Sequence, residues 1–182
     1  MAAAKLPDIR FVREALSYDP DTGVFTWRER PLAHFDSVKT WKWWNGRWAG
    51  TQAGSIRRGY WGMLYWSIGV NNGNLFGHRL AWLLTYGADP WPLTVDHING
   101  NSLDNRLSNL RLATQAEQMA NITRQARATL PKGVGRNGRG YQARICVAGK
   151  RLHLGTFSTA EEAAEARHKA AIAFHGEYAR HE

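Results

Sequence analysis

The stretch TVDHINGNSLDNRLSNLRLATQAEQ, residues 94–118, sets a run of polar, ligand-type side chains between two short apolar segments. LTVDH predicts a strand that ends in Asp96 and His97, and LRLAT predicts a second strand after a polar, turn-rich loop. Thr114 followed by Glu117 forms a capping box, which predicts a helix that begins directly after this second strand. The predicted order is therefore strand, long loop, strand and helix.

These residue types suit the hydrolysis of a phosphodiester. His97 can take a proton from a water near neutral pH. Asn109, twelve residues later, can fix the orientation and the tautomer of this imidazole through its amide oxygen. Asp96 can hold a divalent ion, and it can do so beside His97 because neighbouring side chains of a strand point to opposite sides. The alternative is that the Asp-His pair and the Asn-rich loop only shape turns.

Composition favours a polyanionic partner. The 182 residues carry a formal net charge of +9 and a pI of about 10.1, which suits nucleic acid or an acidic membrane. With 43% hydrophobic residues the chain can build a core. No apolar run is long enough to span a bilayer and the N-terminus lacks the apolar part of a signal peptide, so we expect no membrane and a cytoplasmic location.

The single cysteine, Cys146, excludes a disulfide within the chain and argues against structural zinc held by thiolates. Any metal is then expected to have oxygen or imidazole ligands, as magnesium-like ions do.

The run VDHINGN…DNRLSNLR resembles the HNH endonuclease family, in the homing-type branch found in phages and introns. YDPDTGVFTW, AGSIRRGYW and HRLAWLLTYG extend the resemblance over roughly residues 15–122. The family implies a ββα-metal finger that cuts DNA with one divalent ion, for which we expect Mg²⁺, with Mn²⁺ as an alternative. By position, His97 matches the general base, Asp96 a metal ligand and Asn109 the residue that orients the base.

The last motif position of the family is usually His or Asn, and this chain has Gln118 there. Its amide oxygen can bind the ion, although the side chain is one methylene longer than Asn, and Asn121 is an alternative ligand. His78 is expected to pack or to form hydrogen bonds, with metal binding as the alternative. Asn105 and Arg106 are expected to fix the loop, with a phosphate contact as the alternative for Arg106.

The first part of the chain has further predicted elements. PDIRFVREAL predicts a short helix, Asp19 to Gly23 a turn, GYWGMLYWSIGV a strand, and HRLAWLLTYG a helix that ends at Gly87. The basic, tryptophan-rich segment around Trp41–Trp48 shows no clear periodicity. It could stack on bases, or it could supply core tryptophans with Arg and Lys at the solvated edge.

The last third of the chain predicts a basic hairpin followed by a helix. Six Lys and Arg residues and no acid lie between Lys132 and His153. In GYQARICVAGKRLHLGTFS one face is apolar, with Leu152 and Leu154 on the return strand, and AGK forms the turn. Ser158 and Glu161 predict a capping box for a helix with a small-residue face that includes Ile172 and Phe174.

This segment resembles the plant ethylene-response-factor type of DNA-binding domain, through KGV, YQARI, LGTF, STAEEAAEA and AAIAFHG. The resemblance implies that Arg151 contacts bases. His153 stands where the family has a tryptophan and Cys146 where it has an arginine, so sequence preference should differ. The other predicted DNA-binding residues are Arg136, Arg139 and Arg144, and the alternative is an ordinary solvated basic face.

We therefore predict an α+β protein with an HNH nuclease domain at 1–125, a linker at 126–130 and a domain of three antiparallel strands and one helix at 131–182. It is expected to be a monomeric endonuclease for double-stranded DNA that nicks or cuts both strands, in the host cytoplasm if phage-encoded. One alternative is a DNA-binding regulator with an impaired HNH module, and another is a ribonuclease or nonspecific nuclease.

Overall fold

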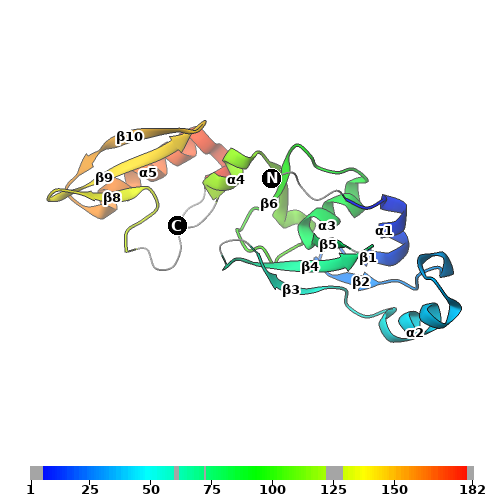
Figure 1. Ribbon diagram of the computed structural model, residues 1–182. Helices are drawn as coiled ribbons and strands as arrows, with labels where there is room; N and C mark the ends of the chain where they lie inside the picture. The colour runs from blue at the N-terminus through cyan, green and yellow to red at the C-terminus, as the bar shows by residue number, and fades with distance from the viewer. Residues whose placement is uncertain (1–5, 60–61, 72, 122–128, 180–182) are drawn as a thin grey trace. The chain divides into compact units, whose positions relative to one another are not determined.

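The computed structural model describes residues 6–59, 62–71, 73–121 and 129–179. The chain forms two compact units, Met1–Leu112 and Ala113–Glu182, and both mix short helices with small sheets, as the predicted α+β class requires (Figure 1). The division falls after Leu112, whereas the sequence predicts a boundary at 126–130, of which residues 126–128 lie outside the described part. Within that part, every helix is too short or too polar to traverse a lipid bilayer.

The first unit begins with the predicted short helix and turn. Asp8 caps the helix by accepting from the Arg10 N–H at 2.8 Å. The side chain of Asp19 accepts from the backbone N–H of Asp21 and from the Thr22 hydroxyl, and Gly23 closes the turn with φ of +75°. The elements are α1 (Ile9–Ala15) and the antiparallel pair β1 (Leu16–Tyr18) and β2 (Phe25–Trp27).

A short 3-10 turn, η1 (Leu32–His34), is followed by a helix that the sequence pattern does not predict, α2 (Val38–Trp48). Ser37 caps this helix by accepting from the Thr40 N–H at 3.1 Å. The segment Trp41–Trp48 is helical although its sequence shows no clear periodicity, because aromatic residues lie on both sides of the helix and hide its period.

The core of the first unit lies between a three-stranded antiparallel sheet and a helix. The sheet has the order β3-β4-β5, and the predicted strand and helix are both present, with Gly87 ending the helix in the left-handed conformation at φ of 76°. Fully buried side chains in this core include Val12, Phe25, Ile68 and Leu80. The elements are β3 (Ser55–Arg58), β4 (Leu64–Val70), β5 (Gly73–Phe76) and α3 (Gly77–Tyr86).

Residues 94–121 have the predicted order of strand, loop, strand and helix. β6 (Thr94–His97) pairs with β7 (Leu110–Ala113), with η3 (Leu107–Asn109) at the end of the loop, and α4 (Gln115–Asn121) follows in the second unit. The capping box is confirmed, since the Thr114 N–H donates to Glu117 Oε2 at 2.7 Å and the Glu117 N–H donates back to Thr114 Oγ1 at 3.3 Å.

The second unit contains the predicted hairpin within a three-stranded antiparallel sheet that packs on one helix (Figure 1). The β9–β10 turn is Ala148–Gly149, both with positive φ, as AGK predicts. The elements are β8 (Val134–Asn137), β9 (Gly140–Val147), β10 (Lys150–Phe157), α5 (Ala160–His175) and η4 (Gly176–Tyr178).

Two details of α5 correct the predictions. The capping box is one residue later than predicted and consists of Thr159 and Glu162, because the helix begins at Ala160. Ile172 and Phe174 are 48% and 52% exposed, so they do not belong to the packed face. That face consists of Ala160, Ala163, Ala164, Ala166 and the buried Arg167 and Ala171. On the sheet, Leu154 joins the apolar cluster, whereas Leu152 is 38% exposed.

Candidate nuclease site and nucleic-acid interface

His97 lies at the end of β6 with 6% of its surface exposed. Its Nε2 is 3.3 Å from Oδ1 of Asn105, and its ring meets the ring of His78 edge-on, with centroids 5.1 Å apart. Burial lowers the pKa of His97, while the hydrogen bond with Asn105 and the negative charges of Asp96 and Asp104 raise it in part. Because burial dominates, the imidazole is neutral near pH 7, which is the form that can accept a proton.

Asn105 is the amide group placed beside the His97 imidazole, whereas the sequence predicts only a loop-fixing role for it. Besides His97, three parts of the first unit converge on it. Its backbone carbonyl accepts from the Tyr18 hydroxyl at 2.7 Å. A Cβ on Gly23 would come within 2.7 Å of its carbonyl carbon, and a Cβ on Gly77 within 2.9 Å of its Nδ2. Asn105 is only 3% exposed, so its amide is held rigidly against His97.

Asn109, which the sequence predicts to orient the base, hydrogen-bonds to other residues of the loop. Its Oδ1 accepts from the Asn99 N–H at 2.9 Å, and its Nδ2 donates to Asn99 Oδ1 at 3.0 Å and to the Asp104 carbonyl at 2.8 Å. These bonds tie the start of the loop to its end. Asn109 therefore braces the segment that carries Asn105, while Asn105 itself touches the imidazole.

Asp96, the predicted metal ligand, forms a buried ion pair that the sequence reasoning missed. Arg111 Nη2 and Nε lie 3.2 and 3.3 Å from Asp96 Oδ2, and the two side chains are 12% and 8% exposed. Arg111 belongs to β7, the strand paired with β6, so the signal was available in the strand pairing. Asp96 and His97 are both buried but contact different partners.

The remaining predicted site residues of this region are placed as follows. Gln118 and Asn121 lie on α4 in the second unit, where Gln118 is half-buried and Asn121 is buried. Arg106 pairs with Asp104, with Nη2 2.6 Å from Oδ2, so its guanidinium fixes the loop. His78 stacks with Phe76 at 5.7 Å and is half-buried, and burial, helped by the charges of His97 and Arg79, lowers its pKa to about 3.

The buried partner of Asp96 is the Arg111 guanidinium, which is a cation and cannot serve as a metal ligand. Among the described residues no group of three or more His, Cys, Asp or Glu side chains lies close enough together to hold a metal ion. A carboxylate with an amide oxygen is nevertheless a donor set that magnesium accepts, since this ion keeps several of its waters.

On the C-terminal sheet the register brings three of the five predicted DNA-binding residues to one face. His153 pairs with Arg144 and Arg151 pairs with Cys146, and all four side chains are exposed. Arg136 pairs with Tyr141 and lies over its ring at 5.7 Å, which places it with the opposite set of β9 side chains. Arg139 lies in the turn between β8 and β9.

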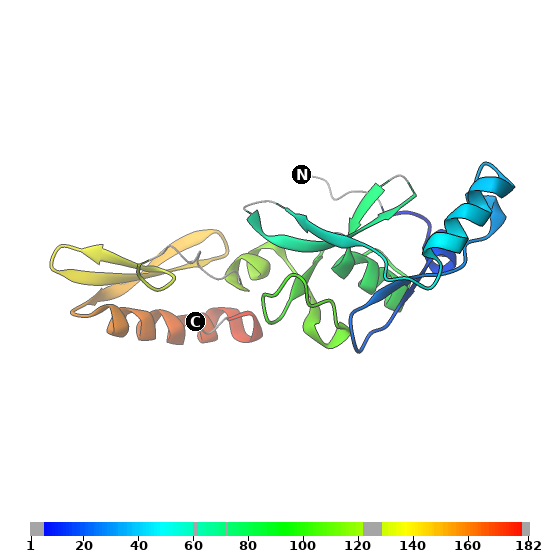
Figure 2. The ribbon, with the colours of Figure 1, turned by 90° about the horizontal axis from the view of Figure 1, so that it is seen from below.

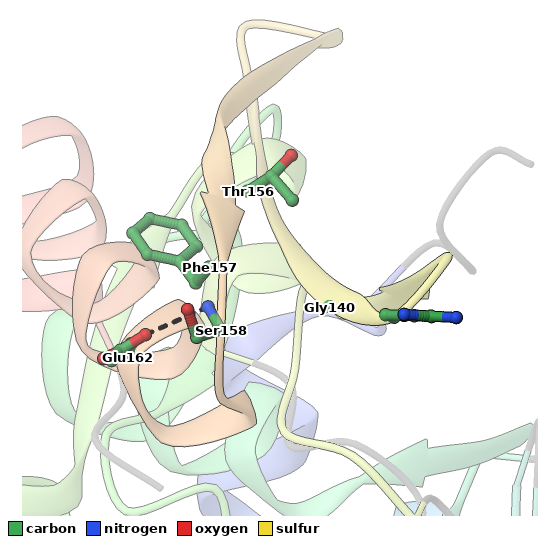
Figure 3. Close-up of a pocket in the computed structure, with 6 residues that line it drawn as sticks. Gly140, Thr156, Phe157, Ser158 and Glu162 are labelled. Carbon is green, nitrogen blue, oxygen red and sulfur yellow. Dashed lines mark hydrogen bonds between the residues drawn. The ribbon is translucent and has the colours of Figure 1, made fainter.

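Arg139 also lines a hollow of the second unit, together with Gly140, Thr156, Phe157, Ser158 and Glu162 (Figure 3). Glu162 points back to the start of α5, where its Oε2 accepts from the backbone N–H groups of Ser158 and Thr159 at 3.1 and 3.3 Å. These donors of the helix start are therefore already used by the protein, and Arg139 is the cation that the hollow offers to an anion.

Comparison with known proteins gives a match for the resemblance to HNH endonucleases. Residues 76–120 match the model of a family described as HNH endonuclease. No curated protein matches the chain. One solved structure, described as "DNA binding and cleavage by the HNH homing endonuclease I-HmuI", aligns with 93% of this chain and 90% of that chain, at 19% sequence identity and a TM-score of 0.39.

The matched segment runs from the last residue of β5 through α3, β6, the polar loop and β7 into α4. The segment that matches the HNH endonuclease model contains Asp96, His97, Asn105, Asn109 and Gln118.

Proposed function

We propose that the protein is a metal-dependent DNA endonuclease of the homing HNH type, in which His97 is the general base. The observation that carries this proposal is the family-model match, which covers both strands, the loop between them and the helix as far as residue 120. The +9 net charge supports DNA as the substrate, because a polyanion is attracted at long range.

The neighbours of His97 define its part in the reaction. With Nε2–H donating to Asn105 Oδ1, the lone pair that accepts a proton is on Nδ1. Nδ1 takes a proton from the water whose oxygen attacks phosphorus, and the bond from phosphorus to the 3′ oxygen breaks. The products are a 5′-phosphate and a 3′-hydroxyl, whose proton comes from solvent. Asn109 serves this step indirectly, by bracing the loop that holds Asn105.

Asp96 is the residue that we expect to hold the divalent ion, Mg²⁺ or alternatively Mn²⁺, as the metal ligand of the family. Its carboxylate oxygens fit a hard cation. When bound, the ion would neutralise charge on the phosphate and on the departing oxygen. Arg111 keeps the Asp96 carboxylate buried and oriented, at 3.2 Å from Oδ2.

We propose that the C-terminal unit reads DNA in the manner of the ethylene-response-factor domains that it resembles. Arg144, Arg151 and His153 share one exposed face of an antiparallel sheet, and such a face can enter the major groove. Phosphate and base contacts there would keep DNA near the nuclease and select part of the site. Tethering raises the local concentration of substrate without any new catalytic contact.

A supercoiled-plasmid assay with magnesium tests the proposal. We expect wild type to nick or linearise the plasmid, and His97→Ala to reduce the rate by about 10²–10⁴-fold while still binding duplex DNA. Arg151→Ala is the matched variant, since it should weaken binding and leave some cleavage. Sequencing of both strands at the cut sites identifies nicks and double-strand breaks. Plasmid that stays intact in every divalent metal, or cleavage that is unchanged in His97→Ala, would refute the assignment.

One observation keeps a second function open, a DNA-binding regulator with an impaired nuclease module. Gln118 stands where the family usually has His or Asn. If the regulator is correct, wild type binds duplex DNA and does not cleave it, and Gln118→Asn restores cleavage. Cleavage of RNA in preference to DNA would instead identify a ribonuclease.

A further inference from the structure

The helix α2 has two different faces. Trp41, Trp44 and Asn45 recur at helical spacing and are half-buried. Trp41 Nε1–H and Asn45 Nδ2–H both donate to the Arg30 carbonyl, at 2.8 and 2.9 Å. Trp44 meets Trp27 edge-on, with ring centroids 5.2 Å apart. This face attaches the helix to the rest of the first unit.

The opposite face of α2 consists of Lys39, Lys42, Trp43, Gly46 and Arg47, all exposed. We call these five residues the outer face. Trp43 leaves 60% of its surface in solvent. A tryptophan buries more apolar area than any other residue when it packs, so exposing it amid cations favours a surface that contacts another molecule.

The charged residues of α2 and of the segment that follows it have one sign. No Asp or Glu occurs from Ser37 to Ala88, and this stretch contains six Lys and Arg residues. Two of them, Arg57 and Arg58, lie on β3, an edge strand on which all four residues are exposed. α2 stands at the end of the first unit in both views (Figures 1 and 2). The complementary partner is therefore a polyanion.

Gly46 adds an observation of a different kind. Glycine is unfavourable in the interior of a helix. A Cβ at this position would have nothing within 4 Å, so packing within the protein does not require glycine. The small residue lies between the cations of the outer face, where it lets the backbone of another molecule approach the helix closely.

We propose that the outer face of α2 is a second DNA-binding surface, which contacts the sugar-phosphate backbone of a duplex. Lys39, Lys42 and Arg47 neutralise phosphates, and Trp43 packs on the sugars between them. The inference rests on the proposed function for the choice of DNA as the polyanion. It assigns DNA contacts to the first unit that do not depend on the basic sheet of the second.

The test measures binding of the full chain to a mixed-sequence duplex by fluorescence anisotropy at several salt concentrations. The variant is the triple change Lys39→Ala, Lys42→Ala and Arg47→Ala. Each lost phosphate contact should reduce the slope of log affinity against log salt by about 0.9, which gives about 2.7 for three contacts. The matched control removes the same charge from exposed sites elsewhere, by Arg10→Gln, Arg13→Gln and Lys169→Gln, and should change the slope much less. Thermal unfolding of both variants checks that they fold.

Gly46→Ala gives an independent readout. Alanine should raise the melting temperature, because it favours the helix, and yet weaken duplex binding, because the added methyl keeps the backbone of the duplex away. If Gly46 had only a structural role, the higher melting temperature of Gly46→Ala would not be accompanied by weaker binding to the duplex.

The outcomes distinguish this inference from the proposed function. A triple variant that cleaves plasmid and keeps the wild-type salt slope overturns the α2 surface and leaves the nuclease intact. The α2 surface is also overturned if the triple variant loses affinity only for RNA, or if it turns a dimer into a monomer. Wild-type protein that binds duplex with the α2-dependent slope and cuts no DNA retains the α2 surface and refutes the nuclease.

Discussion

The β6–β7 pair and the β9–β10 pair each consist of two strands that follow one another in the chain. Both pairs carry residues predicted to act on DNA. In the first pair the strands are connected by the twelve residues 98–109, whose side chains form hydrogen bonds within the loop. Asp96 and His97, at the end of β6, are each 6% exposed. The second turns in two residues and exposes Arg144, Arg151 and His153.

This difference in exposure corresponds to the two tasks that we propose for these regions, proton transfer and DNA contact. A group that transfers a proton must be held in one orientation and one tautomer, so buried partners that fix it are useful. A group that meets phosphates of varying position gains from an unconstrained side chain and solvent. Substitutions in the β6–β7 region should therefore affect stability and rate, and substitutions in the hairpin should affect affinity and salt dependence.

The largest effect is expected from breaking the Asp96–Arg111 pair. Arg111→Ala leaves a buried carboxylate without its cation and should lower the free energy of unfolding by about 3–5 kcal/mol. The matched control is Arg79→Ala. Arg79 is about as buried as Arg111, at 14% against 12% side-chain exposure, but its partner Asp89 is 39% exposed, against 8% for Asp96. The control should cost about 1 kcal/mol or less. Urea denaturation in the presence of a chelator measures both, and equal losses would contradict the contrast.

Substitution of Asn105 tests whether a loop amide sets the tautomer of His97, the proposed general base. Asn105→Leu removes the acceptor beside His97 Nε2 and should lower the cleavage rate by about 10–100-fold, the usual effect of losing an orienting partner. Asn105→Asp keeps an acceptor oxygen and should recover part of the rate. Nitrogen NMR of the His97 ring should show Nε2–H in wild type and a mixture in Asn105→Leu. A lower rate with an unchanged tautomer would mean that Asn105 acts through the fold alone.

Substitution of an exposed cation in the β9–β10 hairpin should change the salt dependence of DNA binding and leave the free energy of unfolding almost unchanged. Arg151→Ala should reduce the slope of log affinity against log salt by about 0.9 if the guanidinium meets one phosphate. Its free energy of unfolding should change by no more than about 0.5 kcal/mol, as is usual for exposed positions. Lys169→Ala, which removes an exposed charge paired with Glu165 on α5, is the control and should leave the slope unchanged. Anisotropy titrations and urea curves on the same samples measure the two quantities.

Much of this contrast was predictable from local sequence. Alternation and turn residues predict β6, β7 and the β9–β10 hairpin, and the caps at Asp8 and Thr114 agree with the helices that follow them. The start of α5 shows the limit of such signals. Both Ser158 with Glu161 and Thr159 with Glu162 fit the capping-box pattern, and only the local geometry selects the second.

The contact between Asn105 and His97 could not be predicted in the same way. The two residues are eight positions apart in an irregular loop, and the orientation of the amide depends on Tyr18, Gly23 and Gly77, which are far away in the sequence. Tertiary packing decides such a contact. The helix α2 was missed because its local sequence signal is hidden. Tryptophan occurs on both its packed face and its outer face.

The pH dependence of stability should depend on His78, the neighbour of His97. Burial lowers the pKa of His78 to about 3 in the folded state, below its ordinary value of 6.5, so folding favours the neutral ring. Its contribution to stability is therefore complete above about pH 6.5 and is lost as pH falls from there toward 3. His78→Phe keeps an aromatic ring and removes the titration, so its free energy of unfolding should fall less than that of wild type between pH 7 and pH 5. Urea curves at the two pH values measure the difference, and parallel losses would show that the ring is hydrated enough to take up a proton without unfolding.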